Sequence, residues 1–141
     1  MRTAGITVVV AEGAPPGSRR PDPRHDLGRR GEAAAARHLE ALGLRILARG
    51  VRTRAGEIDL VAEEGGTLVF VEVKTRSSLA WGRPSEAVDR RKRERLTRAA
   101  AVFLIGLDGP EPPCRFDVAE VVERPDGVLQ VALIRDAFQA D

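Results

Sequence analysis

The sequence predicts an α/β domain in which helices flank a mixed β-sheet, with the element order α-β-β-β-α-β-β. Two segments repeat apolar residues at helical spacing, and five shorter runs have β-strand character. Turn signals separate four of these runs in pairs: Gly65-Gly66 lies within the first pair and Pro125-Asp126-Gly127 within the second. The chain therefore predicts two strand pairs with a helix between them.

The first helix is predicted from about Leu27 to Leu42, with Asp26 as its N-cap and Gly43 after its end. Its apolar stripe consists of Ala35, Leu39 and Leu42. Stepping back along this stripe by three or four residues reaches Glu32, so this acid is predicted to lie on the core-facing side.

The second helix is predicted to begin near Ser85 and to end before Gly106. Its inner stripe includes Lys92 among apolar residues, namely Val88, Leu96, Ala99 and Phe103. The strands are expected at Leu44–Ala48, Glu57–Glu63, Thr67–Lys74, Arg115–Glu123 and Val128–Ile134.

The composition indicates one globular domain preceded by a tail. The chain has 141 residues, of which 43% are hydrophobic and 31% are charged, and this suits a single core. Residues 1–24 contain several prolines and little apolar surface, so they are predicted to be a disordered tail, with a short strand at Thr7–Val10 as an alternative. Residues 25–141 are predicted to form the domain.

The cysteine and histidine content limits both the compartment and the metal. No apolar stretch approaches the roughly 20 residues that span a bilayer, and no signal peptide is recognised. Cys114 is the only cysteine, so no intrachain disulfide forms and the protein is predicted to be cytoplasmic. With only His25 and His38 beside it, a metal would rest on carboxylates, which favours Mg²⁺ or Mn²⁺ over Zn²⁺.

The Gly65-Gly66 hairpin is the feature that points to chemistry. If these glycines are the two turn residues, Asp59 lies directly opposite Glu72, and Glu57 lies opposite Lys74. One face then carries two carboxylates and an ammonium. The other face is predicted to be apolar core, made by Ile58, Leu60 and Ala62 against Val69, Val71 and Val73.

Two opposed carboxylates could hold one hard divalent cation, which lowers the pKa of a bound water and neutralises charge in phosphoryl transfer. Lys74 lies on the same face and could orient or activate that water. Glu32 is a third acid that needs a partner, since an unpaired buried carboxylate is costly. The competing interpretation is a solvated strand face with ordinary cross-strand ion pairs.

Basic residues surround this hairpin, although the formal net charge is only +2. Arg52 and Arg76 are predicted to contact nucleic acid as part of a basic rim with Arg45, Arg49 and Arg54. Lys92 is either a phosphate contact or a side chain that extends its head to water. The run Arg90–Arg95 is either a nucleic-acid surface or an exposed face with i,i+4 ion pairs.

The chain contains an ordered set of motifs: Gly28-Arg29-Arg30-Gly31-Glu32, Gly56-Glu57-Ile58-Asp59-Leu60, Phe70-Val71-Glu72-Val73-Lys74-Thr75-Arg76, Gly82-x-Pro84-x-Glu86-Ala87-Val88 before Lys92, and Arg115-Phe116-Asp117. Together they resemble the YraN family of small bacterial proteins, which are thought to be endonucleases. The resemblance covers about Leu27 to Ile134.

That family is similar to the PD-(D/E)XK nucleases and, in layout, to archaeal Holliday-junction resolvases. The resemblance implies a restriction-endonuclease-like core in which Asp59 and Glu72 hold Mg²⁺ or Mn²⁺. It implies that Glu32 is the assisting acid on the first helix and Lys74 the catalytic lysine. Ile58 stands where the superfamily has proline.

The predicted function is therefore metal-dependent hydrolysis of phosphodiester bonds in structured nucleic acid, with DNA favoured over RNA. Asp59, Glu72, Lys74 and Glu32 are the predicted catalytic residues. A homodimer is an option, because junction-resolving relatives act as dimers. The alternatives are a non-catalytic nucleic-acid-binding module that recruits partners and a purely structural ion-pair cluster.

Overall fold

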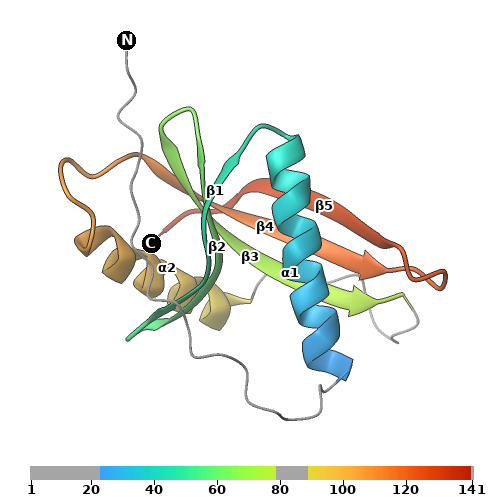
Figure 1. Cartoon of the computed structure of the whole chain (residues 1–141). Coiled ribbons are helices and arrows are strands. Elements are labelled where there is room, and N and C mark those ends of the chain that lie inside the picture. Colours follow the sequence, from blue (N-terminus) through green and yellow to red (C-terminus); the bar gives the residue numbers. More distant parts are fainter. Residues whose placement is uncertain (1–22, 79–88, 141) are drawn as a thin grey trace, which may run out of the picture.

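A computed structural model describes residues 23–78 and 89–140 of the chain. Its elements follow the predicted order, and the α/β class is confirmed (Figure 1). They are α1 (Pro23–Ala41), β1 (Arg45–Thr53), β2 (Gly56–Glu64), β3 (Thr67–Ser77), α2 (Arg90–Ile105), β4 (Cys114–Glu123) and β5 (Leu129–Phe138).

The five strands form one mixed sheet in the order β1-β2-β3-β4-β5. β1, β2 and β3 are antiparallel neighbours, β3 and β4 are parallel, and β4 and β5 are antiparallel. The parallel pair requires a crossover, which α2 provides. The predicted hairpin register is confirmed where the strands pair, from Glu64↔Thr67 to Leu60↔Val71.

The two helices cover opposite faces of the sheet, and each buries its own apolar cluster (Figure 1). The α2 cluster contains Leu96, Ala99, Phe70 and Phe116. The α1 cluster contains Ala35, Leu39, Val71 and Val121. Both faces of β3 are thus buried along its first half, which explains its continuous apolar run.

Several predicted boundaries are wrong at helix starts. α1 begins at Pro23, within the predicted tail, because proline fits the first turn of a helix. Asp26 lies in that first turn and is not the N-cap. α2 begins at Arg90, and Asp89 is its N-cap because its side chain accepts the Lys92 N–H over 3.0 Å. Leu42 is 45% exposed and does not extend the buried stripe.

The helix end at Gly43 is confirmed, since its φ of +97° favours glycine. β1 runs five residues beyond its predicted end at Ala48, and Gly50, with a φ of +56°, lies inside the strand. Several predicted features lie outside the described residues. They are the rest of the predicted tail, Trp81, Ser85, Val88 and the motif that starts at Gly82. No helix in the described ranges is both long and apolar enough to cross a bilayer.

Candidate metal centre

The ladder between β2 and β3 ends where the acidic residues begin. Beyond its last pair, Leu60↔Val71, the backbone N–H of Val73 donates to Asp59 Oδ2 over 2.8 Å. The aspartate side chain therefore replaces strand backbone as the acceptor for this N–H, which would otherwise lose its partner. β2 separates from β3 at Asp59, and this separation opens the site.

The same irregularity overturns part of the predicted hairpin face. Ile58 packs in the α2 cluster, whereas Leu60 packs in the α1 cluster. Strict alternation would place both side chains on one face. The prediction is wrong here because it extended a regular register through Asp59. As a result, Asp59 lies between the two faces of the sheet and can be reached from both.

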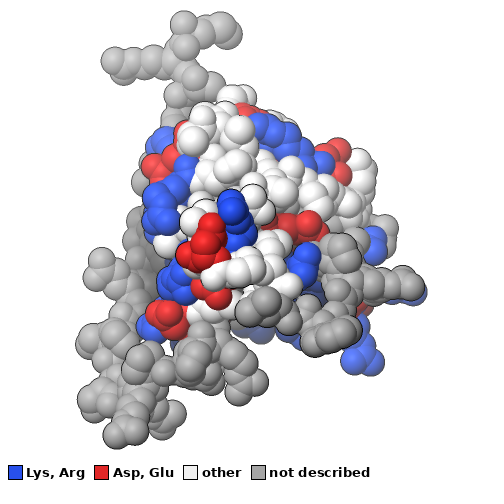
Figure 2. All heavy atoms as spheres, turned by 90° about the vertical axis from the view of Figure 1, so that its right-hand side faces the viewer, with Lys and Arg blue, Asp and Glu red and all other residues white. Residues whose placement is uncertain are grey.

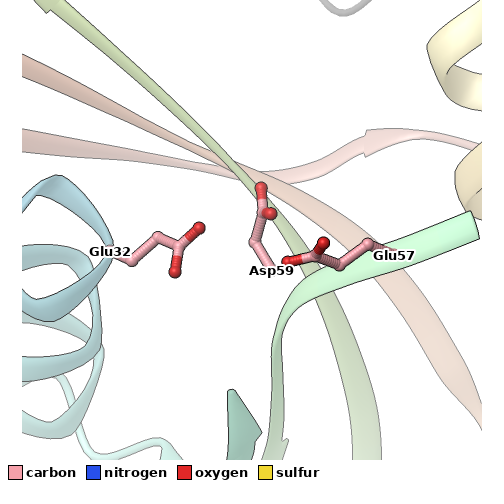
Figure 3. A group of neighbouring side chains, drawn as sticks. All are labelled: Glu32, Glu57 and Asp59. Atoms are coloured by element: carbon pink, nitrogen blue, oxygen red, sulfur yellow. The ribbon is translucent and has the colours of Figure 1, made fainter. Parts of the chain in front are cut away.

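Gly31 brings the first acid to this opening. A Cβ added at Gly31 would lie 2.0 Å from Thr75 Oγ1 and 2.9 Å from Thr75 Cβ, so α1 can approach β3 this closely only with glycine at that position. The next residue is Glu32, which is half-buried and directed at the open edge of β2 (Figure 3).

Three carboxylates meet there. One oxygen each from Glu32, Glu57 and Asp59 lies within 4.8 Å of the other two. Figure 3 shows the groups pointing toward one another from α1 and from the beginning of β2. Such a set of oxygen donors fits a hard divalent cation such as Mg²⁺ or Mn²⁺.

Glu72 approaches Asp59 from β3. Its carboxyl group lies beside that of Asp59, and each group affects the pKa of the other. Burial and the charge of Asp59 raise the pKa of Glu72 to about 7. Burial also raises the pKa of Asp59, against the lowering effect of the Val73 N–H.

The pKa of Glu32 is raised for similar reasons. Its burial, followed by the charges of Asp59 and Glu57, raises the pKa of Glu32 to about 7. Acids that repel one another in a half-buried cleft are stabilised by protons or by a cation. The donor chemistry and the electrostatics of the cleft therefore both fit a metal ion.

Lysine and arginine side chains line two adjoining hollows beside these acids. The first hollow is lined by Glu57, Asp59, Glu72, Lys92, Arg95 and Leu96. The second is lined by Glu72, Val73, Lys74, Thr75, Arg76 and Lys92. Glu72 and Lys92 belong to both, and the charge of Lys92 lowers the pKa values of both Asp59 and Glu72.

The structure thus brings Glu32, Asp59, Glu72, Lys74 and Lys92 to one region, with Arg76 at its side. Sequence reasoning missed two residues that line it. Glu57 was placed opposite Lys74, but the β2–β3 ladder has ended before it and Glu57 turns toward Glu32. Arg95 belongs to the run that the sequence left as either a nucleic-acid surface or an exposed face; it is exposed, and it lines the hollow beside the buried Leu96.

The predicted basic rim is only partly available. Arg45 forms an ion pair with Glu63 at 2.6 Å, and Arg49 lies 3.9 Å from Glu40. Arg52 is exposed and lies across β1–β2 from Glu57. The face drawn in Figure 2 shows acidic and basic side chains interspersed, without a continuous basic surface.

These features define an α/β protein with an acidic cluster that could hold a metal ion. The model of the uncharacterised protein family UPF0102 matches residues 31–121, and this chain belongs to that family. UPF0102 protein STH1475 of Symbiobacterium thermophilum is 55% identical over 114 residues, which cover 81% of this chain and 97% of that protein.

Further relatives agree in extent. UPF0102 protein CT2262 of Chlorobaculum tepidum is 52% identical over 117 residues, which cover 79% of this chain and 91% of the relative. A UPF0102 protein of Moorella thermoacetica is 50% identical over 118 residues, which cover 82% and 97% of the two chains. The matched family segment includes every residue of the acidic cluster.

Proposed function

We propose that this protein is a metal-dependent nuclease of the PD-(D/E)XK kind that hydrolyses phosphodiester bonds in structured nucleic acid, in the first instance DNA. The observation that carries the proposal is the separation of β2 from β3 at Asp59. It places carboxylates from α1, β2 and β3 in one cleft with two lysines.

Asp59 and Glu72 would hold Mg²⁺ or Mn²⁺, with Glu32 assisting from α1. Glu57 adds a carboxylate within reach of the same ion. When bound, the ion supplies Lewis acidity, lowers the pKa of a water molecule and offsets charge on the transferred phosphoryl group.

Lys74 lies two residues beyond Glu72 on the same face of β3 and lines the hollow that they share. From that position its ammonium holds the attacking water or a phosphate oxygen. Lys92 contacts the phosphate from α2, and Arg76 and Arg52 bind the strand further from the acids. The nucleic acid is gripped through its backbone, which suits recognition by shape.

The test is cleavage of labelled four-way, nicked and single-stranded DNA, and of single-stranded RNA, with Mn²⁺ or Mg²⁺ and with EDTA. Asp59→Asn and Lys74→Met should each lower the rate by about 100-fold or more. Glu111→Gln is the matched control, because it removes an exposed carboxylate before β4.

Cleavage that needs no metal, or that survives Asp59→Asn, would contradict the proposal. Metal-independent binding without cleavage in the parent and in both variants would favour the non-catalytic binding module instead.

A further inference from the structure

Arg95 lines the hollow that contains Glu57, Asp59 and Glu72, referred to below as the acidic cleft. It lies one helical turn after Lys92 and directly before the buried Leu96, and all three line the first hollow. A Cβ added at Gly56 would lie 2.9 Å from Arg95 Cγ and 3.2 Å from its Cδ. The aliphatic part of Arg95 therefore rests on the bare backbone of Gly56, at the beginning of β2.

The packing on Gly56 restrains the aliphatic stem that carries the Arg95 guanidinium. Gly56 has a φ of +145°, a conformation that favours glycine, and the missing side chain makes room for the arginine stem. Because the stem is held, the guanidinium loses less conformational entropy when it binds a ligand. Arg95 is exposed and lines the same hollow as Glu57, Asp59 and Glu72.

The charge of Arg95 is not used inside the described structure. Within residues 23–78 and 89–140, no hydrogen bond or ion pair joins its side chain to another residue. Arg115 is the contrast, since it donates to Asp117 over 3.1 Å and to Glu64 over 2.9 Å. A guanidinium that lies beside three acids without pairing with any of them is available to an external anion.

We infer that Arg95 is a phosphate-binding residue of this cleft and grips a backbone phosphate of the nucleic-acid strand next to the metal ligands. This inference rests on the proposed function for the identity of the anion. The planar fork of arginine matches two phosphate oxygens, whereas Lys92 beside it acts as a point charge.

The two hollows indicate the path of the strand. They meet at Glu72 and Lys92, with Arg95 at one end and Lys74 and Arg76 at the other. A strand that lies along both hollows places successive phosphates at Arg95, at Lys92 and beside Arg76. Its central phosphate then faces the Asp59–Glu72 pair, as cleavage within a strand requires.

The test is fluorescence anisotropy with a labelled single-stranded DNA and a labelled four-way DNA, in EDTA and over a series of salt concentrations. Arg95→Met keeps the stem on Gly56 and removes the charge. Arg98→Met, on the same helix but outside both hollows, is the matched control. Arg95→Lys restores the charge without the fork.

Arg95→Met should weaken binding roughly 10- to 100-fold, as expected for loss of a charge-assisted hydrogen bond. It should also reduce the slope of log K against log salt by about 0.7 to 0.9, the value for one phosphate contact. Arg95→Lys should restore the slope but only part of the affinity. Arg98→Met should change affinity less than about threefold.

Equal effects of Arg95→Met and Arg98→Met on affinity and slope would overturn the inference, as would no binding of either DNA by the parent. Stabilisation by Mn²⁺ in a thermal melt separates the two proposals. A parent that binds DNA through Arg95 but gains no stability from Mn²⁺ would support the phosphate contact and contradict the metal-dependent nuclease.

Discussion

Two charged clusters of this protein use aspartates in the same way but with opposite surroundings. In the acidic cleft, Asp59 accepts the Val73 N–H where the β2–β3 ladder ends. In the second cluster, Asp117 accepts the Asp136 N–H over 2.9 Å where the β4–β5 register shifts. Each aspartate therefore takes over a backbone donor at an irregular point of the sheet.

The partners of the two aspartates differ. Asp117 is completely buried, and the Arg115 guanidinium pairs with it and with Glu64, which also accepts from Arg135. These hydrogen bonds from Arg135 and Arg115 lower the pKa of Glu64. Beside Asp59, burial and the charges of nearby carboxylates raise the pKa values of Glu32 and Glu72.

The difference teaches how to recognise a ligand site among charged clusters. The Arg115 cluster is complete, with opposite charges and backbone donors matched to each carboxylate. The carboxylates around Asp59 still repel one another although Lys92 lowers the pKa values of Asp59 and Glu72, so protons or a metal ion would stabilise them further. The first cluster is expected to govern stability and the second to govern chemistry.

The largest effect is expected from a substitution in the Arg115 cluster. Asp117→Ala should destabilise the protein by about 3–5 kcal/mol, because the Asp136 N–H loses its acceptor and the Arg115 guanidinium keeps only Glu64. Denaturant unfolding measures this. Asp126→Ala is the control, since Asp126 pairs with Arg124 at the surface and should cost about 1 kcal/mol or less. A loss at Asp117 no larger than the control would show that the network is not structural.

The second prediction concerns metal binding by the carboxylates around Asp59. Mn²⁺ at 100 times its dissociation constant should stabilise the parent by about 2.7 kcal/mol. The gain should disappear in Asp59→Asn, which keeps an acceptor for the Val73 N–H but loses the charge. Thermal melts with and without EDTA at pH 8 measure it. An undiminished gain in Asp59→Asn would place the ion elsewhere.

The third prediction separates two glycines of α1. Gly31→Ala should destabilise by about 1–3 kcal/mol, because its methyl group collides with Thr75 and pushes Glu32 away from Asp59. Gly28→Ala meets nothing within 4 Å and should stabilise by about 0.4–1 kcal/mol. Unfolding midpoints of the two variants measure this, and equal shifts would refute the close approach.

The smallest expected effect is a pH dependence without metal. The pKa of Glu72 is about 7 in the folded protein, above the ordinary glutamate value of 4.5. The folded state therefore binds more protons than the unfolded state between these values, and stability falls as pH rises through this window. The pKa of Glu64 is lowered, so its titration affects stability only at a pH below this window.

Denaturant unfolding in EDTA from pH 5 to pH 8 should show a loss on the order of 1 kcal/mol, since screening by solvent reduces the full linkage value. Glu72→Gln should make this decline smaller, and the part that stays comes from Glu32, whose pKa is also about 7. A parent whose stability rises across the range would indicate that the acids do not repel one another.

The sequence was sufficient for the element order and for the hairpin register near its turn. Gly65-Gly66 specifies the pairing of nearby residues, and two separate periodicities distinguish helices from strands. The same pattern could not show where the ladder stops. Nothing in the residues around Asp59 reveals that its side chain will accept the Val73 N–H, because that hydrogen bond depends on how the sheet twists.

Glu57 and Arg95 were missed for related reasons. Glu57 turns toward α1 only because β2 leaves β3, which is a tertiary effect. Arg95 resembles the other arginines of its helix until the β1–β2 hairpin places Gly56 under its stem. The predicted roles of Asp59, Glu72, Lys74 and Glu32 stay predictions, although the structure brings these residues to one cleft.

The pairing of β3 with β4 has a consequence for how the cleft can change over evolution. β4 pairs with every residue of β3 from Leu68 to Ser77. Because the Val73 N–H points toward β2, the backbone groups of its neighbours Glu72 and Lys74 point toward β4. The hydrogen bonds that hold this strand therefore do not depend on which side chains stand at these two positions, so the chemistry of the cleft can be lost or altered while the sheet stays intact.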